Sequence, residues 1–334
     1  MSVIEARILH KQDFAQWDHF IRNSEQGTVF HLSEWMTITA RMVHADYAII
    51  GMFHNSDLIG GCTFFIKNIF HIYRRGRSDM PLTPYGGIVL SLPKTTNVRS
   101  SETRELEIIS LILDKIETFN LFSLTLIHSP AIRDIRAFIW KGWTERVYYA
   151  YMMMLDDDIF LHVSHAVRKT IRKAQRNGIT VTREYLPDTY WELIQSTYKK
   201  QNKELPFEKD HLFALMEYLF YNNLGEMWIA KTPSGEVVSA VFNVYDRHVV
   251  HGWQGANDPR FRDTGATSLL LFEVLMELQR RGYRCCNLMA ANTPHLATFY
   301  SGFNPRLVPY YGVEKTDRTN YYLLDEVFGK LPKK

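Results

Sequence analysis

The sequence predicts an α/β (α+β) protein of two tandem units, each a mixed, mostly antiparallel sheet flanked by helices. Two observations support this prediction. Helical and extended hydrophobic patterns alternate along the chain. The elements of the second half also follow the same order as those of the first, as expected for a duplicated unit. A length of 334 residues agrees with about two domains.

The first half is predicted to begin with a strand and to end with one. The expected elements are a strand over 3–9, a helix over 14–21, a helix capped by Ser33, strands over 47–54 and 58–67, a basic loop over 71–77, a turn over 84–87, a helix over 102–119, a strand over 122–127, a short helix over 132–140 and a strand over 143–155.

The second half is expected to repeat this order after a boundary at Asp156-Asp157-Asp158, which gives domains 1–156 and 157–334. Two ordinary helices are expected within 187–223, around Leu205-Pro206. The later elements are strands over 227–230, 237–245 and 249–253, a helix over 265–281, a strand over 284–289, a short helix over 294–301, strands over 306–314 and 321–324, and a frayed end at 330–334.

Composition excludes several classes of protein. Hydrophobic residues make up 46% and charged residues 22%, which is ordinary for a globular core, and a net charge of +3 permits only a local basic patch. The three cysteines, Cys62, Cys285 and Cys286, are too few for a disulfide framework. No zinc-ligand spacing is present, and we expect neither a metal nor a tightly bound cofactor.

The beginning of the chain, MSVIEARILHKQDF, lacks the apolar core of a signal peptide. No apolar run reaches the ~20 residues of a membrane-spanning helix. We therefore expect a cytoplasmic protein that meets any membrane-bound acceptor from the cytoplasmic side.

A basic helix is predicted over 164–177, between an N-cap at Ser164 and a stop at Gly178. Arg168, Arg172 and Arg176 follow one another at four-residue spacing on one face. Like charges at this spacing destabilise a helix, which favours an anionic partner. The alternative is a solvated helix face without a ligand.

Three segments of the second half resemble the FemAB-like transferases. They are GATSLLLFEVLMELQRRGYR from Gly265, HLATFYSGFN and LVPYYGVEK. The resemblance implies two tandem GNAT-like domains that join an amino acid or acyl group to an amine. The family pattern Phe-Lys-x-x-Phe-Gly is present at 299–304, with Tyr300 in place of Lys and Asn304 in place of Gly. Members carry an arginine-rich helix for substrate recognition, and Arg168 and Arg172 match it.

The loop before the long helix is a second candidate site. In acyl-CoA-dependent relatives this loop holds a pyrophosphate, and Arg260, Asp263, Gly265 and Ala266 stand at the matching positions. Asp263 replaces a glycine and disfavours an anion there. We expect the backbone ahead of Gly265 and the cations near Arg172 to form one phosphate cradle. The alternative is an ordinary helix-capping loop.

The short helix carries His295, Phe299 and Tyr300 as candidate donor-binding residues. The resemblance to acetyltransferases implies that Tyr300 is a general acid, and the resemblance to FemAB proteins implies a contact to substrate phosphate instead. The alternative is an amphipathic core tyrosine.

Two further sets of residues are candidates for the substrate pockets. Trp253 and Gln254 follow Gly252 on a strand that is bulged in GNAT folds, and they are predicted to line the acceptor pocket. His251, a lone histidine on an apolar strand, is more often structural than a base. The FemAB-like proteins place part of the acceptor site on the first domain, so the resemblance implies a second wall of the pocket formed by His31, Trp35, Tyr85 and Gly86.

These expectations converge on an N-acyltransferase in which an acceptor amine attacks an activated ester or thioester. Aminoacyl-tRNA is the favoured donor because of the basic helix and Asp263. Acyl-CoA is the alternative co-substrate, favoured by the fold and Tyr300. The acceptor is expected to be an amine-bearing small molecule or a cell-envelope precursor. A third hypothesis is that the protein is a non-catalytic binding module of the same fold.

Overall fold

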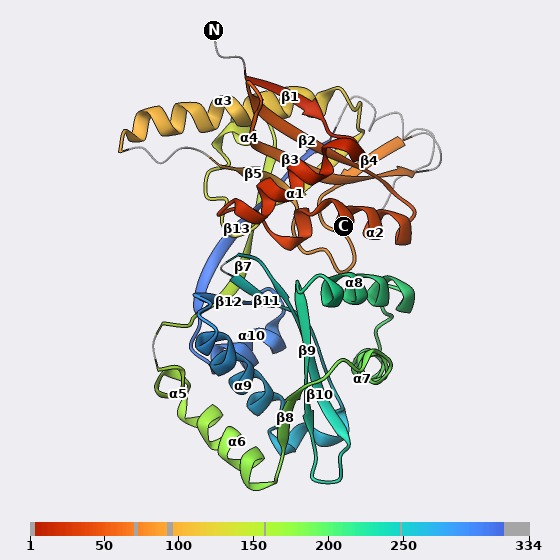
Figure 1. Ribbon diagram of the computed structural model, residues 1–334, viewed down its shortest axis with the longest axis vertical. Helices are drawn as coiled ribbons and strands as arrows, with labels where there is room; N and C mark the ends of the chain where they lie inside the picture. Colours follow the sequence, from red (N-terminus) through yellow and green to blue (C-terminus); the bar gives the residue numbers. More distant parts are fainter. Residues whose placement is uncertain (1–3, 70–72, 92–95, 157, 248, 317–334) are drawn as a thin grey trace. The chain divides into compact units, whose positions relative to one another are not determined.

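The computed structural model describes residues 4–69, 73–91, 96–156, 158–247 and 249–316. The chain divides into two units (Figure 1). Unit 1 comprises residues up to Val147 together with those from Tyr310 onward, and unit 2 comprises Tyr148–Pro309. Strands β7 (Thr144–Met154) and β13 (Arg306–Thr316) each cross the division along the sequence.

Unit 1 contains a sheet with the strand order β1-β2-β3-β4-β6-β13, to which β5 adds by pairing with β3. Neighbouring strands are antiparallel except β4 and β6, which are parallel. The strands are β1 (Ile4–Ile8), β2 (Asp46–His54), β3 (Asp57–Ile69), β4 (Tyr73–Arg77), β5 (Gly87–Leu90) and β6 (Ser123–Ile127). The helices are η1 (Lys11–Asp13), α1 (Phe14–Asn23), η2 (Val29–His31), α2 (Ser33–Met42), α3 (Val98–Glu117) and α4 (Arg136–Trp140).

The core of unit 1 forms between α3 and the sheet. Ile108, Ile109 and Ile112 of α3 are fully buried, at the spacing of one helix face, and pack with strand residues such as Ile50 and Val313. Val313 belongs to β13, so the last described strand completes the core of the first unit.

Unit 2 contains a sheet with the strand order β7-β12-β11-β10-β9-β8, in which only β11 and β12 are parallel. Its remaining strands are β8 (Thr180–Arg183), β9 (Gly225–Lys231), β10 (Val237–Tyr245), β11 (Val249–Asn257) and β12 (Cys285–Met289). Its helices are α5 (Ile159–His162), α6 (His165–Arg176), α7 (Pro187–Lys200), α8 (Lys209–Tyr221), η3 (Pro259–Thr264), α9 (Ala266–Arg280) and α10 (Pro294–Ser301).

Helices cover both faces of the unit 2 sheet. Val241 of β10 packs with the cluster that includes α9, whereas the next residue, Phe242, lies with Leu219 of α8 against Gly225. Successive strand residues point to opposite faces. The helices α6, α9 and α10 therefore belong to one face, and α7 and α8 to the other.

The predicted fold class is confirmed, and several predicted turns have the expected backbone. Gly178 and Gly282, which follow α6 and α9, have positive φ of 70° and 82°, and Asn304 has φ 57°. These are left-handed conformations, which glycine and asparagine adopt most readily. The antiparallel meander β9-β10-β11 is also present as predicted.

Other predictions of local structure were wrong. The described part of the expected basic loop, Tyr73–Arg77, is strand β4, because the ladder with β3 outweighs its polar composition. Ser33 is the first helical residue rather than the cap, and its backbone N–H and hydroxyl both donate to Asp18. The prediction of a turn over 84–87 missed β5, and α5 and β8 were not predicted. The expected last strand, 321–324, and the end at 330–334 lie outside the described residues.

The division into units also differs from the expected boundary at residues 156 and 157. Tyr151–Met154 pair with β12 and so belong to the second unit, whereas Gly312–Thr316 return to pair with β6 of the first. A boundary drawn from sequence order cannot anticipate a strand that returns to the earlier sheet.

Candidate active site

The centre of the candidate site is the place where β11 loses its partner β12. The register pairs β11 with β12 only over Val249–His251, although β11 continues to Asn257. On its other side, β11 is bulged: Phe242 pairs with Gln254 and Asn243 with Gly252, so Trp253 is the additional residue. The predicted bulge is confirmed. A bulge leaves backbone groups outside the regular ladder, where they can meet a ligand.

Side chains leave space around this bulge. A Cβ on Gly252 would meet nothing closer than the Asn287 carbonyl oxygen at 3.8 Å, and one on Gly255 would meet nothing within 4 Å. Trp253 is itself buried, with its ring edge-on to Phe242 at 5.8 Å between centroids. Gln254 is half-buried. The structure therefore gives Trp253 a packing role and leaves Gln254 as the partly accessible side chain.

Tyr300 lies on α10 next to the parallel strands. Burial, together with the smaller effect of the nearby Cys286 thiol, raises the pKa of its phenol to about 12. Cys286 is fully buried on β12, and the Gly252 backbone N–H donates a hydrogen bond to its sulfur. Tyr300, Cys286 and the bulged strand are thus neighbours. Phe299 packs edge-on to Tyr300 at 5.1 Å, whereas His295 is exposed.

The loop before α9 does not present a free phosphate cradle. Gly265 has φ 82° and caps α9, and a Cβ there would lie 2.6 Å from the Thr170 carbonyl oxygen and 3.3 Å from Ala174 of α6. The neighbouring Ala266 is also buried. The guanidinium of Arg260 is paired with Asp258 at 2.6 Å and with Glu236 at 2.9 Å. Helix α6 therefore covers the N-terminus of α9.

This packing corrects the expectation of one cradle shared by Gly265 and Arg172. Thr170 and Ala174 lie two positions after Arg168 and Arg172, which corresponds to a rotation of about 200° around the helix axis. The face of α6 that touches Gly265 is therefore roughly opposite the face that carries Arg168 and Arg172. The basic residues belong to a separate surface.

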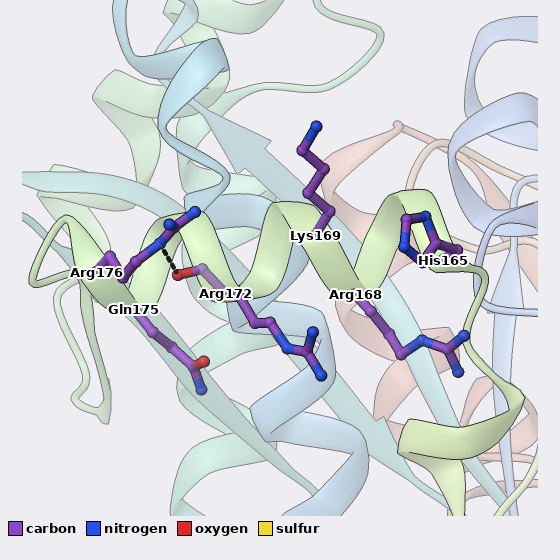
Figure 2. A pocket seen from close by; sticks show the side chains of 6 residues that line it. All are labelled: His165, Arg168, Lys169, Arg172, Gln175 and Arg176. Carbon is purple, nitrogen blue, oxygen red and sulfur yellow. Dashed lines mark hydrogen bonds between the residues drawn. The ribbon is translucent and has the colours of Figure 1, made fainter.

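That surface is a hollow along α6 (Figure 2), lined by His165, Arg168, Lys169, Arg172, Gln175 and Arg176. Figure 2 shows Arg168 and Arg172 projecting from the same side of the helix. Arg168 donates to the Phe160 and Leu161 carbonyl oxygens of α5 at 3.4 and 3.0 Å, and the Arg172 guanidinium lies 5.6 Å from the Phe160 ring centre.

The six residues that line this hollow are called the basic face of α6 below. No ion pair joins its cations to a carboxylate within the described parts of the chain. Two or more guanidinium groups held on one side of a helix suit phosphate, because each planar fork can bind two oxygens.

The candidate residues of unit 1 are part of its core. Trp35 and Tyr85 are almost fully buried; the Trp35 indole donates to the Thr83 hydroxyl at 2.9 Å, and the Tyr85 ring packs against Phe30. His31 is fully buried as well, and a Cβ on Gly86 would lie 2.9 Å from the Ser78 carbonyl oxygen. The expected pocket wall was wrong for these residues, because the aromatic side chains pack against one another.

Sequence reasoning missed two features of the site. His251 is not alone: its Nε2 lies 2.5 Å from Asp246 Oδ2, and both side chains are nearly buried. Tyr190 of α7 was assigned to an ordinary helix, yet its hydroxyl donates to the Gln254 carbonyl oxygen at 2.6 Å. The contact of Tyr190 with Gln254 leaves no signal in the sequence, because the partners are 64 residues apart. Asp246 and His251 are five residues apart across the β10–β11 hairpin, so this pair could have been proposed from the predicted strands.

The described residues contain neither a cluster of metal ligands nor a membrane-spanning helix. Within them, no group of three or more His, Cys, Asp and Glu side chains is arranged to hold a metal ion. Among the same residues, no helix is both long and apolar enough to cross a bilayer.

Comparisons with known proteins agree with this architecture. Residues 162–295 match the family model of the acetyltransferase (GNAT) domain. The solved structure of FemX is similar, with a TM-score of 0.75 at 11% identity over 96% of this chain and all of that one. The structure of L-PGS from Bacillus licheniformis gives a TM-score of 0.56 at 12% identity, covering 95% and 97% of the two chains. No curated protein sequence matches.

A tandem GNAT protein from the clavulanic acid biosynthesis pathway gives a TM-score of 0.55 at 10% identity, covering 94% of this chain and 98% of that one. The fold is therefore that of the GNAT-type acyltransferases in tandem arrangement. Among them, the resemblance to the FemAB-like proteins predicted from the sequence is confirmed at the level of the fold by FemX.

Proposed function

We propose that this protein is an N-acyltransferase that moves an aminoacyl group from aminoacyl-tRNA to an acceptor amine, forming an amide. The observation that carries the choice of donor is the packing of α6. Its Thr170 carbonyl oxygen and Ala174 side chain cover Gly265 at the start of α9, where acyl-CoA-dependent relatives hold a pyrophosphate. Its opposite face offers cations to a phosphate backbone instead.

The proposed chemistry needs only positioning and charge stabilisation. The acceptor nitrogen attacks the ester carbonyl carbon, a C–N bond forms, and the C–O bond to the ribose breaks. Backbone N–H groups of the bulged β11 stabilise the negative charge on the carbonyl oxygen. Tyr300 donates its proton to the leaving ribose oxygen and regains one from the attacking amine by way of water.

The state of Tyr300 suits this role. With a pKa raised to about 12, the phenol keeps its proton at neutral pH and gives it up only as the leaving oxygen gains charge. We further propose a cytoplasmic location, and an acceptor that is an amine-bearing small molecule or a cell-envelope precursor.

Acyl-CoA remains the second candidate donor, because Tyr300 lies beside the diverging strands β11 and β12 as in an acetyltransferase site. Titration with aminoacyl-tRNA, uncharged tRNA and acetyl-CoA separates the candidates. We expect aminoacyl-tRNA to bind and to release its amino acid to added amines. Binding of acetyl-CoA alone would overturn the tRNA proposal, and binding of neither donor would indicate a non-catalytic module.

A further inference from the structure

Helix α7 holds strand β11 through two hydroxyl groups. Tyr190 donates to the Gln254 carbonyl oxygen at 2.6 Å. The Thr197 hydroxyl accepts from the Asn257 N–H at 3.3 Å and shares its single proton between the carbonyl oxygens of Asn257 at 3.0 Å and Leu193 at 2.9 Å. The two residues are seven positions apart, which places them about two turns apart on one face of the helix. The strand segment from Gln254 to Asn257 is therefore fixed at both ends by the same helix.

The Tyr190 hydroxyl lies at the bulge itself. Gln254 and the bulged Trp253 together face Phe242, and the Phe242 backbone also forms a hydrogen bond with the Tyr190 hydroxyl. Tyr190 is fully buried, and burial raises the pKa of its phenol. The hydroxyl thus stays protonated and meets backbone groups of both strands where the regular ladder is interrupted.

Tyr190 also interacts electrostatically with Tyr300, the other candidate group of the site. The Tyr300 phenol is among the neighbours that raise the pKa of Tyr190. Tyr190 reaches the bulged strand directly at Gln254, whereas Tyr300 lies beside Cys286, which accepts from Gly252 of the same strand. The two tyrosines belong to helices on opposite faces of the sheet.

We propose that Tyr190 is a positioning residue: its hydroxyl fixes the β11 bulge in the conformation that turns backbone N–H groups toward the acyl carbonyl of the donor. This inference rests on the proposed aminoacyl donor. The physical reason is that a bulge can relax into other registers unless its backbone groups are satisfied. A phenylalanine fills the same volume but leaves the Gln254 carbonyl oxygen without this donor.

The test uses Tyr190→Phe, with Tyr198→Phe on the same helix as the matched control. The Tyr198 side chain is half-buried and its ring packs against Phe207, so this control loses a hydroxyl at a distance from the bulge. Two probes are titrated: 3′-alanylamino-3′-deoxyadenosine, a stable mimic of a charged tRNA end, and 3′-amino-3′-deoxyadenosine, which lacks the acyl carbonyl.

We expect the wild type and Tyr198→Phe to prefer the acylated probe, and Tyr190→Phe to lose about tenfold of that preference while still binding the other probe. If Tyr190 had only a structural role, its loss would weaken the binding of both probes equally. Hydrogen exchange of residues 250–258 should rise in Tyr190→Phe and not in the control Tyr198→Phe. Thr197→Val loosens the far end of the segment and should show a smaller loss of the preference for the acylated probe. This variant replaces Tyr190→Phe in the test if Tyr190→Phe does not fold.

The outcomes distinguish this inference from the proposed function. If Tyr190→Phe and Thr197→Val keep the full preference of the wild type, the role of Tyr190 is overturned and the donor proposal stands. If the wild type binds the two probes equally, the proposed donor is overturned, and the role of Tyr190 toward its carbonyl is overturned with it.

Discussion

At the scale of single residues, the proposed role of Tyr300 predicts the largest effect on the rate of transfer. Tyr300→Phe removes the proposed proton donor and should lower the transfer rate roughly 10²–10⁴-fold without unfolding the protein. Since the pKa of Tyr300 is raised to about 12, the phenol remains protonated far above neutrality. The rate of the wild type should therefore not fall between pH 8 and about pH 10 through loss of this proton.

The measurement is a pH profile of single-turnover aminoacyl transfer for the wild type and Tyr300→Phe. A variant with unchanged rate would remove Tyr300 from the mechanism. Tyr283→Phe is a suitable control, because Tyr283 stacks on Tyr245 in the same unit and is not part of the candidate site.

Glu226 makes a prediction about stability. This carboxylate is buried, lies 2.9 Å from Arg281 and 3.2 Å from Arg183, and accepts from the Trp228 indole at 2.5 Å. Burial raises its pKa, but the nearby Tyr245 hydroxyl and the hydrogen bonds from Trp228 and Arg281 together outweigh burial, and the net pKa is lowered below 4.5. Glu226→Gln leaves these partners without a charge and should cost about 3 kcal/mol of unfolding free energy.

The lowered pKa also fixes the direction of the pH dependence. The stabilisation by Glu226 is complete above its unfolded pKa near 4.5 and is lost as the pH falls through the lower folded value. Urea unfolding between pH 7 and pH 3 should show a steeper loss for the wild type than for Glu226→Gln. Glu217→Gln, at an exposed position on α8, should behave as the wild type.

At the scale of elements, α6 was the part of the site that the sequence located best. Its cap at Ser164, its bounds and its basic stripe were all predicted, because capping and helical periodicity are local properties. Its relation to α9 was not predictable, since Gly265 meets Thr170 only after the chain has folded. The same reasoning explains why β4 was predicted as a loop. Its arginines give the segment a polar composition, and its strand conformation depends on the ladder with β3.

The basic face of α6 gives a prediction of its own. The double variant Arg168→Ala/Arg172→Ala should weaken tRNA binding, and the slope of log affinity against log salt should decrease in magnitude by about two. The control Lys199→Ala/Lys200→Ala removes the same charge from the exposed end of α7. Fluorescence anisotropy at several salt concentrations measures both. Equal slopes for the two double variants would show that the α6 face is only solvated.

At the scale of the whole molecule, the sequence predicted the number and type of units but not their boundaries. The repeated order of elements was sufficient for the tandem arrangement, because each unit must bury its own hydrophobic faces. The returning strand β13 was counted with the second half, since it follows α10 in the sequence. In the structure, Gly312–Thr316 pair with β6 instead.

A substitution on β13 can test whether this strand belongs to unit 1 or, as its place in the sequence suggested, to the second unit. Val313 is buried in the core of unit 1, so Val313→Asp places an unpaired charge there and should cost about 4 kcal/mol or more. Leu307 lies on the same strand and is 55% exposed, so Leu307→Asp should change the stability by no more than about 0.5 kcal/mol.

Hydrogen exchange then reports which unit depends on Val313. In Val313→Asp, protection should fall in α3 and β6, the elements that pack with or pair to β13 in unit 1, and should persist in α9 and β12. If protection instead fell first in α9 and β12, β13 would be an element of the second unit, as its place in the sequence suggested. The result matters for any dissection of the protein, because residues 157–334 expressed alone would carry away a strand that unit 1 requires.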